Sequence, residues 1–357
     1  MLIRNPMICS AHDGLLLKGA CWHDDERAPS SALLIIHGML EHIRRYEKTA
    51  ADLVDAGVRV YAFDLRGHGT TAPEEENRGY FADRDGVDLL LSDMDRMLGA
   101  VRADLKREGL DDIPFCVLGH SMGSFITSCY LKARGTTGSD GVILSGTTAR
   151  PGPVGIARAI ARLQSATIGP KSKGRLLTKI AFGPYNARIK PVRTINDWLT
   201  RDDAIVDAYN ADPACTFKFK AAGFADLFSM LGTIGSSNWT DAVSKNLKIL
   251  LIAGRMDPVG GYGKGPEILH EWFRATGHDC TLRLYPDGRH EMLNELNRDA
   301  ALRDILIFLQ ALSGRAGTNQ PVGLKEPAMA SGPGPDTDSS EEKAPADPSA
   351  DPAPATP

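Results

Sequence analysis

The chain has 357 residues, of which 42% are hydrophobic and 24% are charged, and its formal net charge is -4. From residue 321 onward seven acidic and two basic side chains sum to -5, which leaves +1 for residues 1–320. A near-neutral body excludes the basic footprint of a nucleic-acid-binding protein, and its length suffices for one large α/β domain or two ordinary ones.

The cysteines and the N-terminal residues indicate the compartment. Six cysteines are scattered without C-x-x-C spacing, which predicts free thiols in a reducing environment. Residues 1–7 have neither the basic nor the apolar region of a signal peptide, and no run of about twenty apolar residues would span a membrane. We therefore expect a cytoplasmic protein.

The first part of the chain alternates short apolar strands with amphipathic helices. Residues 7–22 predict an opening β-hairpin that turns at His12-Asp13-Gly14. Further strands are expected at 32–36, 58–63, 115–118 and 141–144, and helices at 46–56, 87–108 and 124–131. Because these strands are apolar throughout, they predict a mostly parallel sheet with helices on both faces.

The alternation pauses between residues 148 and 239. Helical spacing of apolar residues such as Ile156 and Ile160, with breaks at two Gly-Pro pairs, predicts an inserted helical cap. The earlier pattern then resumes, with strands at 247–253 and 281–285 and helices at 266–275 and 298–312. We therefore expect an α/β core at 1–147 and 240–313, interrupted by a cap at 148–239.

Residues 314–357 have a different composition. They contain no aromatic side chain and consist largely of Pro, Ala, Ser, Gly and acidic residues. Such a segment cannot bury enough apolar surface to offset the entropy lost when it orders. We expect a disordered, acidic tail that catalysis does not require.

Gly119-His120-Ser121-Met122-Gly123 follows the strand expected at 115–118 and leads into a helix. A G-x-S-x-G turn between a strand and a helix holds its serine at strained backbone angles, and the glycines remove side chains that would collide with both elements. The hydroxyl then stands exposed above the sheet. We predict that Ser121 is a nucleophile and that the Met122 N–H forms half of an oxyanion hole.

A serine nucleophile needs a histidine to take its proton and a carboxylate to orient that histidine. Both partners are expected beyond the carboxyl ends of later strands, in the order Ser, acid, His. Asp257 follows the strand at 247–253, and His290 follows the strand at 281–285. Asp279 and Asp287 are alternative acids, although they flank the strand before His290 and would approach it from the wrong side.

The second half of the oxyanion hole is expected in the loop after the strand at 32–36. His37-Gly38-Met39 fits this place, because Gly38 allows a close backbone approach and the Met39 N–H can pair with that of Met122. His37 is expected to hydrogen-bond within the loop rather than act as a base. Apolar residues expected to line an acyl pocket are Leu40, Ile156, Ile160 and Phe182.

Four separated motifs resemble the bacterial type of the monoacylglycerol lipase and lysophospholipase branch of the α/β-hydrolase superfamily, which is similar to serine aminopeptidases. They are His37-Gly38-Met39-Leu40-Glu41-His42 with Arg45-Tyr46, Asp64-Leu65-Arg66-Gly67-His68-Gly69, Asp257-Pro258-Val259-Gly260 and His290-Glu291-x-x-Asn294-Glu295. In the cap, residues 197–202 and Asp212-Pro213 resemble stretches common in bacterial members. The resemblance covers residues 10–312 and implies an α/β-hydrolase fold with a helical cap.

The resemblance also implies hydrolysis of a carboxylic ester, usually a single-chain lipid such as a monoacylglycerol or lysophospholipid, without metal or cofactor. Ser121, His290 and Asp257 would act as the triad. The expected partners are small-molecule or lipid esters, with at most transient membrane contact through the cap. Acyl length, head group and oligomeric state are left open.

Three other functions fit the same residues. One is acyl transfer to an alcohol other than water. Another is peptide hydrolysis, in which acidic cap residues such as Asp202, Asp203 and Asp207 would hold the substrate's ammonium group. The third is a binding module without activity, although all three triad positions are filled.

Overall fold

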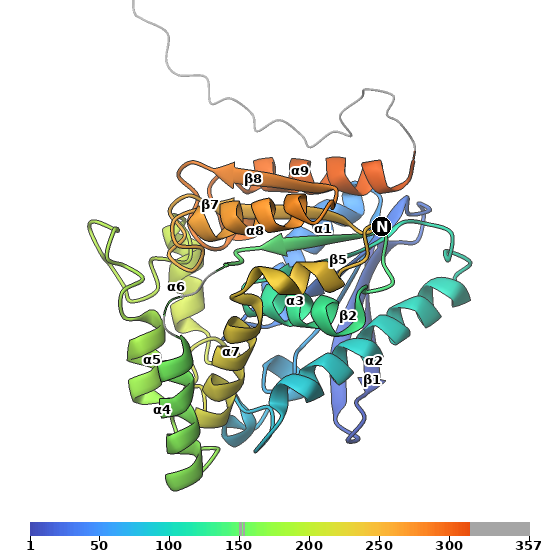
Figure 1. Cartoon of the computed structure of the whole chain (residues 1–357). Helices are drawn as coiled ribbons and strands as arrows, with labels where there is room; N and C mark the ends of the chain where they lie inside the picture. The colour runs from blue at the N-terminus through green and yellow to red at the C-terminus, as the bar shows by residue number, and fades with distance from the viewer. Residues whose placement is uncertain (150–151, 153, 315–357) are drawn as a thin grey trace, which may run out of the picture. The chain divides into compact units, whose positions relative to one another are not determined.

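The computed structural model describes residues 1–149, 152 and 154–314. Its strands are β1 (Leu2–Ser10), β2 (Leu16–Asp24), β3 (Ser31–Ile36), β4 (Val58–Phe63), β5 (Phe115–His120), β6 (Gly141–Ser145), β7 (Lys248–Gly254) and β8 (Cys280–Tyr285). They form one sheet in the order β1-β2-β4-β3-β5-β6-β7-β8 (Figure 1). β2 pairs antiparallel with β1 and β4, and the remaining pairs are parallel. The expected mostly parallel α/β-hydrolase sheet is confirmed.

Helices cover both faces of this sheet. The helices outside the cap are α1 (Glu47–Asp55), α2 (Gly86–Arg107), α3 (Met122–Arg134), α8 (Lys264–Ala275) and α9 (Arg298–Leu312). Leu34 and Ile36 of β3 belong to the core cluster that contains α2, α3 and α8, whereas Leu33 and Ile35 belong to the cluster with α1 and α9. Because both faces of β3 are buried, the strand is apolar throughout.

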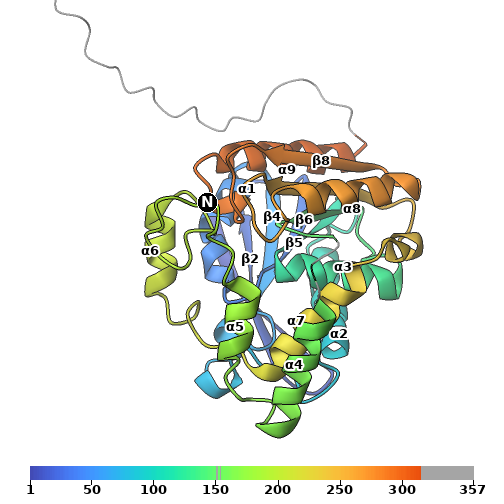
Figure 2. The same cartoon turned by 60° about the vertical axis from the view of Figure 1, so that its left-hand side comes forward.

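The chain between β6 and β7 is helical, as its spacing predicts. Its helices are α4 (Val154–Thr167), α5 (Arg175–Phe182), α6 (Asp203–Ala211) and α7 (Ala221–Ile234). α4 packs on α5 and α7, and α7 also contacts α2 and α3 of the core (Figures 1 and 2). All described residues belong to one compact unit, so we propose the cap as a layer of that unit rather than a separate body. The expected tail lies outside the described residues, apart from Gly314.

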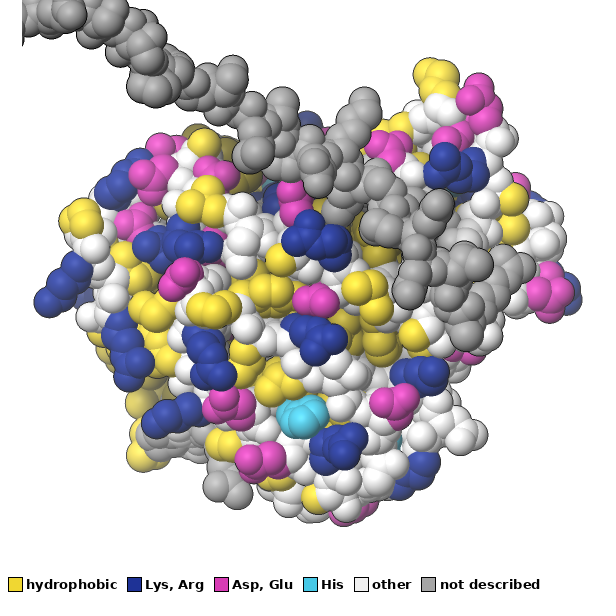
Figure 3. Space-filling view, turned by 90° about the horizontal axis from the view of Figure 1, so that it is seen from above, with side chains coloured by type: hydrophobic (Ala, Val, Ile, Leu, Met, Phe, Trp, Pro, Cys, Tyr) yellow, Lys and Arg dark blue, Asp and Glu magenta, His cyan; other side chains and the backbone are white. Residues whose placement is uncertain are grey.

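The surface agrees with the near-neutral charge of the body. On the face seen from above Figure 1, Lys and Arg side chains lie among Asp and Glu side chains (Figure 3). In the described ranges, none of the helices combines the length and apolarity that crossing a bilayer requires. All six cysteines are free thiols.

Candidate active site

Ser121 lies at the sharp turn between β5 and α3, at the carboxyl edge of the sheet. Its backbone angles, φ 52° and ψ -120°, fall in a region that is costly for any residue with a side chain. A Cβ on Gly123 would lie 2.0 Å from the Ile36 carbonyl oxygen, so only glycine fits there. The Ser121 N–H donates to the Ser145 carbonyl at 2.8 Å, which ties the turn to β6. The turn therefore holds Ser121 in a strained conformation on the wall of a cavity of about 580 Å³.

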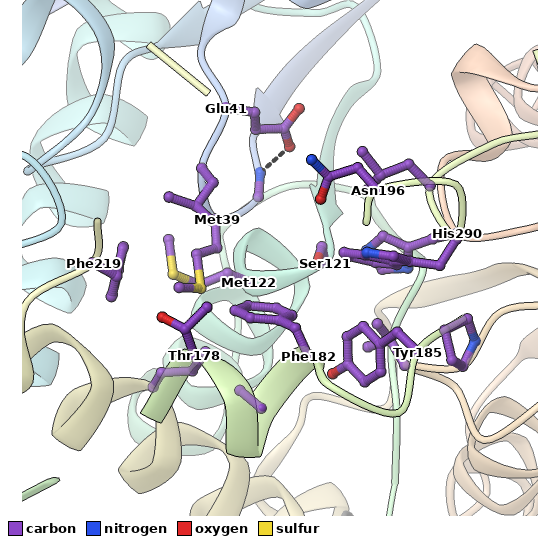
Figure 4. Close-up of a pocket in the computed structure, with 18 of the residues that line it drawn as sticks. Met39, Glu41, Ser121, Met122, Thr178, Phe182, Tyr185, Asn196, Phe219 and His290 are labelled. Atoms are coloured by element: carbon purple, nitrogen blue, oxygen red, sulfur yellow. Dashed lines mark hydrogen bonds between the residues drawn. The ribbon is translucent and has the colours of Figure 1, made fainter. Parts of the chain in front are cut away.

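Asp257 and His290 follow β7 and β8 and meet at the same edge. The His290 Nδ1–H donates to Asp257 Oδ2 at 3.0 Å, and the two side chains are 2% and 0% exposed. Asp257 Oδ1 also accepts from the Val259 N–H at 2.8 Å, which fixes the carboxylate. His290 lines the same cavity as Ser121 (Figure 4). The structure thus brings the three predicted residues together, with no direct hydrogen bond between the Ser121 hydroxyl and His290 among the described contacts.

The environment of His290 sets its protonation. Burial alone would lower its pKa, but the charge of Asp257 and the hydrogen bond to it raise the pKa above the ordinary value. The two alternative acids do not share this environment. Asp287 has an 81% exposed side chain near Arg201, and Asp279 is exposed. Of the three acids considered from the sequence, only Asp257 bonds His290.

The loop after β3 lies against Ser121. A Cβ on Gly38 would approach the Ser121 Cβ to 3.0 Å, so glycine permits the close contact. Neither the Met39 N–H nor the Met122 N–H, which lies at the start of α3, makes a hydrogen bond to another described residue. Both methionines line the cavity. Met39 and Met122 thus line the same cavity as Ser121, and their N–H groups are unpaired among the described residues.

Two buried histidines fasten this loop to the loop after β4. His37 donates from Nδ1 to the Gly38 carbonyl at 2.8 Å and accepts at Nε2 from the Leu65 N–H at 2.9 Å. His68 accepts at Nε2 from the Leu40 N–H at 3.3 Å. Burial lowers the pKa of His37 and lowers that of His68 to about 3. Both rings stay neutral at ordinary pH, and they hold the two loops together by hydrogen bonds rather than act as bases.

A buried ion network joins the Gly38 loop to the His290 loop. Arg45 donates to both carboxylate oxygens of Glu291 at 2.7 Å and to Glu41 Oε2 at 3.0 Å. Glu41 Oε1 in turn accepts from the Gly38 N–H. Burial alone would raise the pKa of Glu291, but the guanidinium beside it lowers this pKa to about 2. The resemblance named these residues without assigning them a role, and the structure shows that they connect the two halves of the site.

A cap segment, residues 197–201, is hydrogen-bonded to the same histidine loop. The N–H groups of His290 and Glu291 donate to the carbonyls of Trp198 and Leu199 at 3.4 and 2.8 Å. The Trp198 ring centroid lies 5.0 Å from that of His290, and Arg201 Nε donates to Glu295 at 2.9 Å. The cap therefore helps to position His290, which the sequence did not predict.

Of the four residues expected in the acyl pocket, two line the cavity and two do not. Leu40 and Phe182 line the cavity. Ile156 and Ile160 are not among its described lining residues: Ile156 is 67% exposed, and Ile160 packs against the edge of the core. The inner face of α4 is formed by Ala157 and Ala161 instead, because α4 packs closely on α7. Ile156 therefore points away from the cavity, whereas Ile160 packs against the core without lining the cavity.

Several described lining residues were not identified from the sequence. Apolar ones include Phe125, Tyr185, Trp198, Phe217, Phe219, Leu227, Phe228 and Leu231. Polar ones include Glu41, Asn196, Asn210 and Thr216. The alternation of Phe217 and Phe219 around exposed Lys218 is the signal of an extended segment with one buried face, and it would have identified the two phenylalanines.

One group of described residues brings metal-ligand atoms together. His42, Asp212 and Cys215 each offer one such atom within 4.8 Å of the others. His42 Nε2 and Asp212 Oδ2 are hydrogen-bonded at 2.8 Å, and this bond links the core to the cap. The contact therefore has a structural use that needs no ion.

The chain is similar to known proteins along most of its length. A family model described as "Serine aminopeptidase, S33" (Hydrolase_4) matches residues 27–297. A monoacylglycerol lipase of Mycolicibacterium smegmatis is 29% identical over 79% of this chain and 88% of that protein. A phospholipase of Bacillus subtilis is 28% identical over 80% of this chain and 97% of that protein. The crystal structure of a carboxyl esterase from Bacillus coagulans in complex with glycerol matches with a TM-score of 0.77 at 27% identity. The match covers 88% of this chain and 100% of the esterase chain.

Proposed function

The chain belongs to the Hydrolase_4 family of esterase- and lipase-like serine hydrolases, and from this membership we propose that it cleaves carboxylic esters through an acyl-enzyme on Ser121. One observation carries the proposal. A strained serine and a histidine that is held by a buried aspartate at 3.0 Å line the same cavity. Labelling with a fluorophosphonate probe tests it, and an adduct on Ser121 is the expected result.

The mechanism follows from the proton positions. Asp257 keeps the His290 proton on Nδ1, so Nε2 is free to take the Ser121 proton as the hydroxyl oxygen attacks the ester carbonyl. The resulting oxyanion accepts from the N–H groups of Met39 and Met122. His290 then protonates the leaving alcohol, and in the second half it activates a water that hydrolyses the acyl-enzyme.

The substrate class that we propose is an ester with one long acyl chain. The monoacylglycerol lipase of Mycolicibacterium smegmatis is named for such a lipid, and the phospholipase of Bacillus subtilis is named for a lipid ester. The cavity supports the same class, because much of its wall is apolar and is supplied by α5, α7 and residues 217–219.

A larger side chain on the apolar wall should occupy part of the cavity and so limit the length of the acyl chain that it accepts. Thr178 of α5 lines the cavity, and we expect Thr178→Trp to lower kcat/KM for p-nitrophenyl dodecanoate by about tenfold or more, since each excluded methylene loses about 0.8 kcal/mol of burial. Turnover of p-nitrophenyl acetate should stay within about twofold. Thr167→Trp is the matched control: each threonine bonds the carbonyl four residues earlier, but Thr167 is exposed on α4. An equal fall in kcat/KM for both esters would contradict the acyl-pocket assignment.

The raised pKa of His290 predicts the pH dependence. Only the neutral ring can take the Ser121 proton, so activity is lost as the pH falls through this pKa. We expect the ascending limb of kcat/KM for p-nitrophenyl acetate to have its midpoint above the ordinary histidine value of 6.5. A midpoint below that value, reproduced with a second aryl ester, would show that Asp257 does not raise the pKa.

Acyl transfer and peptide hydrolysis remain alternatives on the same residues. Acyl transfer would show as a new ester when a competing alcohol is added. For peptide hydrolysis, the acidic cap residues do not face the cavity. Asp202 caps α6, and Asp203 and Asp207 pair with Arg193 at 2.9 and 2.8 Å. Ester hydrolysis therefore has more support than aminopeptidase activity.

We also propose transient membrane contact through the cap. Ile156 and Leu163 of α4 are 67% and 64% exposed at helical spacing, with Arg158 and Arg162 on the same helix. The chain should cosediment weakly with anionic phospholipid vesicles and dissociate on dilution. The double variant Ile156→Ser/Leu163→Ser should lose this binding, whereas Ile307→Ser, which alters a 60% exposed residue on α9, should keep it. Equal binding by all three proteins would exclude contact through α4.

A further inference from the structure

The cavity around Ser121 has an apolar side and a polar side. In the view of Figure 4, Phe219 and Thr178 lie to the left of Ser121, and Asn196 lies above it. Asn196 comes two residues before Trp198, whose carbonyl accepts from the His290 N–H and whose ring centroid lies 5.0 Å from that of His290. In the proposed mechanism His290 donates a proton to the departing oxygen, so the leaving alcohol lies on the histidine side and the acyl chain on the other. The residues at the histidine end of the cavity, Trp198 and the cap residues beside it, are then the ones placed to meet the alcohol.

Two asparagines from the cap form a hydrogen-bonded pair on the cavity wall. Asn196 Nδ2 donates to Asn210 Oδ1 at 2.7 Å. The Asn196 backbone is fixed, because its carbonyl accepts from the Leu199 N–H at 3.0 Å. Among the described residues, Asn196 Oδ1 and Asn210 Nδ2 have no partner, so the pair presents one acceptor and one donor. A hydroxyl group, which both donates and accepts, matches this arrangement.

The charges nearby favour an uncharged alcohol. Glu41 and Glu291 line the cavity, and Arg45 donates its three side-chain hydrogen bonds to these two carboxylates. Its charge is thus compensated and not free for a phosphate. Lys218 also lines the cavity, between Phe217 and Phe219 of the apolar wall, and its side chain is exposed. An anionic group beside His290 would meet the carboxylates of Glu41 and Glu291, and the described cation that contacts them, Arg45, is already paired.

We propose that Asn196 and Asn210 form a hydroxyl-binding subsite for the leaving alcohol, which selects esters of uncharged polyols over esters of simple or phosphate-bearing alcohols. The inference rests on the proposed ester hydrolysis and names the alcohol that the site prefers. Asn196 and Asn210 are specificity-determining residues in this proposal, since they touch the leaving group and not the reacting atoms.

The test compares two esters that differ only in hydroxyl groups, monooctanoylglycerol and propyl octanoate. The full chain should turn over the glycerol ester with kcat/KM about tenfold higher or more, because a site built for hydroxyls discriminates against analogues that lack them. Asn210→Leu, which is nearly isosteric, should bring the ratio of kcat/KM for the two esters close to one, because monooctanoylglycerol loses much more of its turnover than propyl octanoate does. Asn238→Leu, an exposed asparagine outside the cavity, is the matched control.

A second variant, which keeps the hydrogen bond between residues 196 and 210, distinguishes loss of the subsite from misfolding of the cap. Asn210→Asp keeps an acceptor for Asn196 Nδ2 but replaces the outward N–H with a charged oxygen. It should lower turnover of octanoylglycerol phosphate further than that of propyl octanoate. A wild-type ratio near one, faster turnover of the phosphate ester, or equal loss of both octanoates in Asn210→Leu would overturn the subsite. Failure of the wild-type chain on propyl octanoate and p-nitrophenyl acetate alike would instead refute the proposed ester hydrolysis, and the subsite with it.

Discussion

Replacing Ser121 with alanine should lower kcat for p-nitrophenyl acetate by about 10⁴- to 10⁶-fold. The reason is chemical rather than structural. The hydroxyl is the only group removed, and the strained turn depends on Gly123 and on the Ser121 N–H, both of which the variant keeps. Residual hydrolysis by water at the oxyanion hole is expected. Initial rates at saturating ester, with circular dichroism to show that the fold is intact, measure the effect.

Ser128→Ala is the matched control for this prediction. Ser128 lies on α3, about two turns beyond Ser121, and its buried hydroxyl has no hydrogen-bond partner in the described structure, so its loss should leave kcat unchanged. A fluorophosphonate adduct should form on the wild-type chain and on Ser128→Ala, and be absent from Ser121→Ala. If Ser121→Ala kept wild-type turnover, the nucleophile would be another residue. If the wild-type chain formed no adduct, the site would be a binding module.

The fold was predictable because its signals are local. The bounds of β4 and α9 coincide with the predicted ranges 58–63 and 298–312, since a buried parallel strand must be apolar throughout and a surface helix must repeat its apolar residues. The sequence also allowed us to select Ser121, Asp257 and His290, because residues just beyond parallel strands meet at one edge of the sheet. Their assignment as a triad is a proposal that the geometry supports.

The remaining features depend on contacts between distant segments. The inner face of α4 is set by its packing on α7, and helical spacing alone leaves that face undetermined. The link from Arg45 to Glu291 joins residues far apart in the chain, and the pair of Asn196 and Asn210 forms only when the cap folds. No periodicity marks such pairs in a single sequence. These polar contacts were therefore not predicted from the sequence, whereas the three residues of the proposed triad were identified from it.

Asp257→Asn should lower kcat by about 10⁴-fold, the second largest effect, without unfolding the chain. Asparagine has almost the same shape and can still accept from the Val259 N–H through its amide oxygen. Its Nδ2, however, would donate to His290 Nδ1. This places the ring proton on Nε2, where it blocks transfer from Ser121. Labelling by the fluorophosphonate probe should slow in proportion, because it needs the same proton transfer.

The pH profile of this variant separates loss of the carboxylate from loss of structure. Asp257 raises the pKa of His290, so the ascending limb of the remaining activity should move to lower pH in Asp257→Asn. A variant damaged only in its packing would lose activity without moving the limb. Asp287→Asn is the control, since this acid is 81% exposed and does not bond His290, and it should keep wild-type activity and the wild-type limb. The reverse pattern, with Asp287→Asn inactive and Asp257→Asn unaffected, would assign the carboxylate to the loop before His290.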